Sequence, residues 1–168
     1  MRGAAAKGPR RSSGLVAGAF AGAAGTAALN ATTYLDMAVR CRPASTTPDE
    51  SADRLLGAVR LLPDDPERRR ARTEGAGALL GLAAGTVVGA LVGVLRARGT
   101  VRRGYPTAAV AGGFAMLAGN GPLMVLGVSD PRTWTRTDWL TDLVPHLVYA
   151  ATVGAALDRL RPEHDRRG

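Results

Sequence analysis

The chain has 168 residues, a net charge of +8 and a single cysteine. This length allows one domain and excludes a membrane unit joined to a separate catalytic module. Apolar stretches of about twenty residues alternate with short arginine-rich segments, whereas a soluble fold spreads its charges along every element. One cysteine excludes an internal disulfide and offers no metal-ligand spacing.

The positive charge belongs almost wholly to arginine, because Lys7 is the only lysine. A basic surplus can indicate a nucleic-acid partner. Here the basic residues flank the apolar runs, as they do in proteins that face anionic lipid. We therefore expect membrane lipids as partners and no nucleic acid. Heavy use of arginine, alanine and glycine favours a bacterial source, and hence the bacterial plasma (inner) membrane.

The chain begins with a basic segment over 1–13, predicted to be disordered, and a first apolar span over 14–37. This span is mostly alanine and glycine, so its insertion depends on neighbouring helices. A basic stretch ahead of an apolar core is also typical of a cleaved signal peptide. Because the helical pattern continues to Met37 without a break, we favour a retained span.

The long first loop contains a predicted amphipathic helix over 48–62. The pattern Thr47-Pro48-Asp49-Glu50 indicates a capping box with Thr47 as the cap. Apolar residues then recur at helical spacing until Pro63 ends the pattern. We expect this helix on the membrane surface or across the end of the bundle. A second helix start follows at Asp65-Pro66-Glu67.

Three further spans are predicted over 75–95, 105–128 and 139–157, followed by a charged tail over 161–168. Trp134 precedes the last span, where an interfacial aromatic belt is expected. Residues 14–160 then form a single membrane domain. The predicted fold is all-α, an integral membrane four-helix bundle with a short amphipathic helix in its first loop.

The arginine content of the two short loops predicts which side of the membrane the N-terminus lies on. Four arginines lie between the second and third spans, and two lie between the third and fourth. Because basic residues are enriched in cytoplasmic loops, the N-terminus is predicted to be cytoplasmic.

Glycines recur at four-residue spacing in the first two spans, and we call these two series the glycine stripes. Small residues at this spacing let two helix backbones approach closely in a membrane. We interpret the stripes as packing within one bundle; packing between subunits of a homo-oligomer or against other membrane proteins is the alternative. The stripes consist of Gly14, Gly18, Gly22, Gly77, Gly81, Gly85, Gly89 and Gly93.

Polar residues in three spans are expected in the same leaflet, and polar groups at that depth face the interior of a bundle. Asp142 and His146 lie one helical turn apart, with Pro145 between them. The groups can simply hydrogen-bond one another and compensate for the backbone bond lost at Pro145, or they can form a proton or solute path. The candidate cluster comprises Asn30, Thr33, Asp36, Asn120, Asp142 and His146.

The stretches AGTAALNATTYLDMAVR (24–40) and DLVPHLVYA (142–150) resemble small uncharacterised bacterial multi-pass membrane proteins. The resemblance implies no settled activity and assigns no functional residue. No phosphate loop, dinucleotide fingerprint, nucleophile elbow or zinc-protease helix occurs, so we expect no enzyme activity, no cofactor and no metal. The expected function is structural or accessory. The first alternative is a small channel or transporter subunit that uses the polar cluster, and the least favoured is an intramembrane enzyme.

Overall fold

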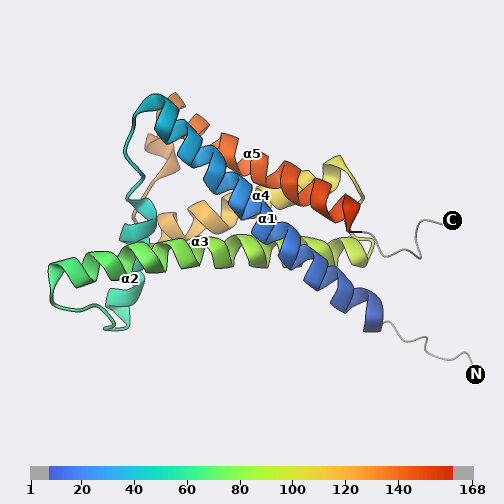
Figure 1. The fold of residues 1–168 in the computed structure, drawn as a ribbon, viewed down its shortest axis with the longest axis horizontal. Helices are drawn as coiled ribbons and strands as arrows, with labels where there is room; N and C mark the ends of the chain where they lie inside the picture. The colour runs from blue at the N-terminus through green and yellow to red at the C-terminus, as the bar shows by residue number, and fades with distance from the viewer. Residues whose placement is uncertain (1–7, 161–168) are drawn as a thin grey trace, which may run out of the picture.

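The computed structural model describes residues 8–160, and every regular element in that part of the chain is a helix (Figure 1). Four of its helices, α1, α3, α4 and α5, are long and apolar enough to cross a membrane. The predicted all-α architecture with four membrane-spanning helices and a short helix in the first loop is therefore confirmed. The elements are α1 (Gly8–Arg40), α2 (Thr47–Ala58), α3 (Pro66–Ala97), α4 (Tyr105–Val125), the 3-10 helix η1 (Pro131–Thr133) and α5 (Arg136–Arg159).

The four long helices run alternately back and forth along the molecule (Figure 1). α1 crosses α3 and also packs along α5, while α4 packs mainly on α5 and to a lesser extent on α3. The segments 41–65 and 126–135 lie at one end of the bundle, which we call the α2 end. The loop 98–104, the start of α1 and the last turn of α5 lie at the other, which we call the terminal end.

The interior of the bundle is built from small side chains, and large apolar side chains point outward. Tyr149, Val92, Val153 and Thr107 are the largest fully buried residues. By contrast Phe20 is 70% exposed and Val125 is 87% exposed. An apolar exterior of this extent is unfavourable in water and is what a bilayer covers.

α1 is longer than the first predicted span at both ends. It begins at Gly8, so residues 8–13, which were predicted to be disordered, are helical. Pro9 lies in the first turn, where a proline is tolerated, and no further proline interrupts the helix before Arg40. Residues 1–7 and the charged tail over 161–168 lie outside the described residues.

α3 begins at the predicted signal Asp65-Pro66-Glu67. The Asp65 carboxylate accepts a hydrogen bond from the backbone N–H of Arg68 at 2.8 Å, and Pro66 occupies the first turn. The helix has 32 residues, a length of about 48 Å at 1.5 Å per residue. Because a hydrocarbon core is about 30 Å thick, the arginine-rich first turns of α3 extend beyond the predicted span at 75–95.

The prediction for the amphipathic helix is wrong at its cap and at its end. The N-cap is Thr46 rather than Thr47, and the Thr46 hydroxyl donates to the Glu50 carboxylate at 2.6 Å. α2 ends at Ala58 instead of 62, because Arg60 adopts a left-handed conformation with φ of +57°. The backbone N–H groups of Arg60 and Leu61 donate to the carbonyls of Gly57 and Leu56, which closes the last turn as a Schellman motif.

α2 packs on the outer turns of α3, at the end of the bundle. Arg69 donates two hydrogen bonds of 2.7 Å to the Asp53 carboxylate, and this pairing holds the pKa of Asp53 below its ordinary value of 3.8. Ala52 and Thr73 are buried in the same contact. Of the two predicted positions for this helix, the structure therefore shows the one across the bundle end.

Each of the last two spans differs from its prediction by three residues at the α2 end, and α5 also ends two residues later, at Arg159. α4 ends at Val125 instead of 128, with Pro122 in its last turn. α5 begins at Arg136 instead of 139, because Thr135 and Asp138 form a capping box that was not predicted. Trp134 and Trp139 pack edge to face at this boundary, with ring centroids 5.0 Å apart.

Candidate functional site

Three of the six predicted polar residues meet between α4 and α5. The side-chain N–H of Asn120 donates to the Asp142 carboxylate at 2.9 Å. The His146 ring lies one turn further along α5, with Nδ1 3.6 Å from the other carboxylate oxygen of Asp142. The side chains of His146 and Asp142 are only 14% and 21% exposed. We call Asn120, Asp142 and His146 the polar triad.

The hydrogen bonds of the triad define the tautomer of neutral His146. Nδ1 lies 2.7 Å from the backbone carbonyl oxygen of Asp142, and a carbonyl oxygen only accepts, so Nδ1 carries the proton. Nε2 is then an acceptor that faces α4, where an added Cβ at Gly119 would lie 3.4 Å from it. The triad can therefore accept a proton at Nε2.

The histidine bond does not replace the backbone bond lost at Pro145. Proline has no N–H to donate to the carbonyl four residues earlier, which belongs to Thr141. His146 instead donates to the carbonyl of Asp142. The predicted compensation at Pro145 is therefore wrong in this detail.

The three predicted residues on α1 do not join the triad. The Thr33 hydroxyl donates to the carbonyl of Leu29 in its own helix at 3.1 Å. Asp36 accepts from Arg42 at 2.5 Å and from Arg40 at 3.4 Å, so it forms an ion cluster where α1 ends. Asn30 lies exposed on the outer face of the helix. The six residues thus divide into the polar triad and three α1 residues that lie apart from it and from one another.

The glycine stripes bring the backbones of α1 and α3 into direct contact. An ideal Cβ at Gly18 would lie 2.4 Å from the carbonyl oxygen of Gly89, and one at Gly22 would lie 2.4 Å from that of Gly85. One at Gly93 would lie 2.2 Å from the carbonyl oxygen of Gly14. No side chain fits at these positions, so glycine is required by the close approach.

Two glycines of the second stripe lie outside this contact, contrary to the predicted role. Gly77 packs against the backbone of Pro48 in α2, with an ideal Cβ 3.0 Å away, rather than against a span. Gly81 has no atom within 4 Å of an ideal Cβ. The reason is that α1 crosses α3 at an angle and then diverges from it towards α5 (Figure 1). The last close contact of the two helices is that of Thr26 with Gly85.

Tyr149 of α5 lies where α1 and α3 diverge, and it was not among the residues predicted to hold the helices together. Its side chain is 1% exposed, and its hydroxyl donates to the carbonyl oxygen of Gly85 at 2.6 Å. An ideal Cβ at Gly25 would lie 2.7 Å from the tyrosine ring. A tyrosine within an apolar run needs a hydrogen-bond partner for its hydroxyl, and that need is the signal that could have identified it.

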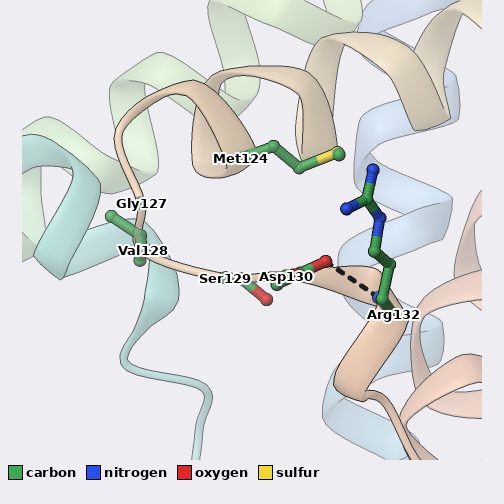
Figure 2. A pocket seen from close by; sticks show the side chains of 6 residues that line it. All are labelled: Met124, Gly127, Val128, Ser129, Asp130 and Arg132. Carbon is green, nitrogen blue, oxygen red and sulfur yellow. Dashed lines mark hydrogen bonds between the residues drawn. The ribbon is translucent and has the colours of Figure 1, made fainter.

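A surface pocket of about 330 Å³ lies at the α2 end, beside the turn that follows α4 (Figure 2). The Asp130 carboxylate accepts a hydrogen bond from the backbone N–H of Arg132 at 2.9 Å, drawn as a dashed line in Figure 2. The Ser129 hydroxyl accepts from the Trp134 indole at 2.9 Å. These polar groups shape the turn. The pocket is lined by Met124, Gly127, Val128, Ser129, Asp130 and Arg132.

The chemistry available to the triad is limited by its donor set. Within residues 8–160, no three histidine, cysteine or acidic side chains come close enough to hold a metal ion. The triad offers one carboxylate and one imidazole, which suits proton binding or hydrogen bonding between helices. Comparison with protein-family models, with curated proteins and with solved structures finds no match to this chain.

Proposed function

We propose that this protein is a small multi-pass protein of the bacterial plasma membrane with a structural or accessory role. The observation that carries the proposal is the direct backbone contact of α1 with α3 along Gly18, Gly22 and Gly89. Two helices in such contact leave no path for a solute between them. Their association is stabilised by dispersion and by interhelical hydrogen bonds such as Tyr149 to Gly85.

The apolar exterior supports the same proposal. Large side chains such as Leu79, Leu117 and Val125 point away from the bundle. Such a surface suits lipid chains or the spans of other membrane proteins, and it can equally pack against a second copy of this chain. The function then lies in what the outer surface binds.

A second candidate function is a small channel or transporter subunit, and the polar triad favours it. Ionisable groups within a span are costly in a bilayer and commonly mark ion or proton paths. Against this, the Asp142 carboxylate and the His146 Nδ1 already have partners inside the protein. A group satisfied in this way is sufficiently explained by helix packing.

Flux measurements on reconstituted protein distinguish the two functions. In liposomes that contain a pH-sensitive dye, we expect proton entry to equal the leak of protein-free vesicles, for the parent and for Asp142→Asn alike. Solute entry should behave in the same way. Flux above the leak that disappears in Asp142→Asn, while Gly81→Ala retains it, would overturn the structural role in favour of transport.

The proposed orientation places Cys41 outside the cell. Cys41 is exposed and follows α1 at the α2 end, so a membrane-impermeant maleimide should label it in intact cells. The matched control is Thr100→Cys in a Cys41→Ser background, which should be labelled only after lysis because the loop 98–104 lies at the opposite end (Figure 1). The reverse pattern would contradict the cytoplasmic N-terminus.

A further inference from the structure

The two ends of the bundle differ sharply in charge. At the α2 end, residues 36–74 and 126–142 contain ten arginines and eleven carboxylates. At the terminal end, residues 13–16, 95–106 and 155–160 contain five arginines and one carboxylate. These residues of the terminal end therefore carry a net charge of +4, and those of the α2 end carry −1.

Arginines of the α2 end are neutralised within the protein. Arg69 pairs with Asp53 at 2.7 Å, and Arg70 pairs with Glu74 at 2.7 Å. Arg42 binds Asp36 at 2.5 Å. These contacts leave little unbalanced charge for an external anion, so the α2 end has no electrostatic preference for an acidic partner.

The terminal end contains an ion pair between two spans, and further arginines follow it in the chain. Arg96 of α3 donates to Asp158 of α5 at 2.5 Å, and the Arg96 side chain is only 10% exposed. This pair links the last turns of two spans and fixes where the loop 98–104 begins. Arg98 and Arg102 follow on this loop with exposed side chains. The only carboxylate at this end in the described residues is thus already paired.

We propose that the terminal end is a docking surface for the headgroups of anionic phospholipids, with Arg98 and Arg102 as its phosphate-binding residues. The inference rests on the proposed membrane location and adds a partner to it. A guanidinium group presents parallel N–H donors that match two phosphate oxygens. Arginines just beyond an apolar span lie at the level of the headgroups, where the surface of an anionic leaflet attracts them.

The position of these arginines favours a lipid over a soluble acidic partner. Arg98 directly follows α3, and Arg102 lies three residues before α4 begins. A leaflet therefore reaches both side chains without any change in the fold. A nucleic acid or an acidic protein would have to compete with the leaflet for the same surface.

Lipid titration of the purified full-length chain tests the proposal. In a neutral detergent, phosphatidylglycerol should raise the thermal unfolding midpoint, and phosphatidylcholine at the same mole fraction should not. In Arg98→Gln/Arg102→Gln, the phosphatidylglycerol content required for half of this effect should rise about fivefold for each arginine removed. Added salt should weaken the effect in the parent, because it screens exposed charges.

Arg60→Gln/Arg68→Gln is the matched control, since it removes the same charge from exposed positions at the α2 end. It should behave like the parent. An equal loss in this control would overturn the proposal, because net charge rather than the terminal end would then attract the lipid. Equal stabilisation by phosphatidylcholine, or by inorganic phosphate alone, would also overturn it. Release of the protein from membranes by alkaline carbonate without detergent would instead refute the proposed membrane function.

Discussion

Gly89→Ala is expected to lower the free energy of unfolding by about 1–3 kcal/mol, the usual range for overpacking a close contact. An ideal Cβ at Gly89 would lie 2.4 Å from the Cα of Gly22 and 2.5 Å from the carbonyl oxygen of Gly18. Both are backbone atoms, so neither can rotate away, and α1 must separate from α3. Thermal or denaturant unfolding of the purified protein in detergent measures the loss.

Gly81→Ala is the matched control for Gly89→Ala. It makes the same change in the same glycine stripe, at a position where an ideal Cβ has no atom within 4 Å. Alanine is a better helix former than glycine by up to about 1 kcal/mol, so stability should stay constant or rise. If both variants unfold like the parent, α1 does not pack on α3 through these glycines.

The fold could be predicted from the sequence because bilayer thickness imposes a length on each apolar run. The helix ends could not, because they depend on local contacts that the apolar pattern does not report. At the end of α2, helical spacing continues to Leu62, yet Arg60 turns left-handed and ends the helix at Ala58. This position is usually glycine, and an arginine there gives no signal.

The glycine stripes predicted close packing but could not define its register. When glycines recur every four residues in both helices, a slide of one helix by four residues again places glycine opposite glycine. The structure aligns Gly18 with Gly89 and Gly22 with Gly85. Other contacts must select this register, and Tyr149 supplies one because its ring packs at Gly25 and its hydroxyl binds Gly85.

The polar cluster was predicted only in part because depth in a span does not determine the face of a helix. Asn30 was predicted in the same leaflet as the triad, but its side chain is exposed. Asp36 lies four residues before Arg40 and six before Arg42, and it pairs with both. Of the six predicted residues, only those of α4 and α5 point at each other, and that pairing depends on how the two helices pack.

The strongest coupling in the triad is expected between Asn120 and Asp142. Their side chains share a 2.9 Å hydrogen bond between two helices, so either alanine substitution leaves the other group unpaired. In a double-mutant cycle of Asn120→Ala and Asp142→Ala, we expect an interaction free energy of about 0.5–2 kcal/mol. Unfolding of the four proteins in one detergent or nanodisc preparation provides the measurement.

The cycle of Asp142→Ala with His146→Ala is the matched control, and its coupling should be below about 0.5 kcal/mol. His146 donates to the backbone carbonyl of Asp142 at 2.7 Å, and alanine at 142 keeps that carbonyl. The distance from His146 Nδ1 to the Asp142 carboxylate is longer, at 3.6 Å. Removal of the Asp142 carboxylate should therefore change the contribution of His146 to the free energy of unfolding only slightly. A larger coupling here than between Asn120 and Asp142 would mean that the two side chains of α5 form a direct ion pair in the bilayer, and the assignment of the neutral tautomer would be wrong.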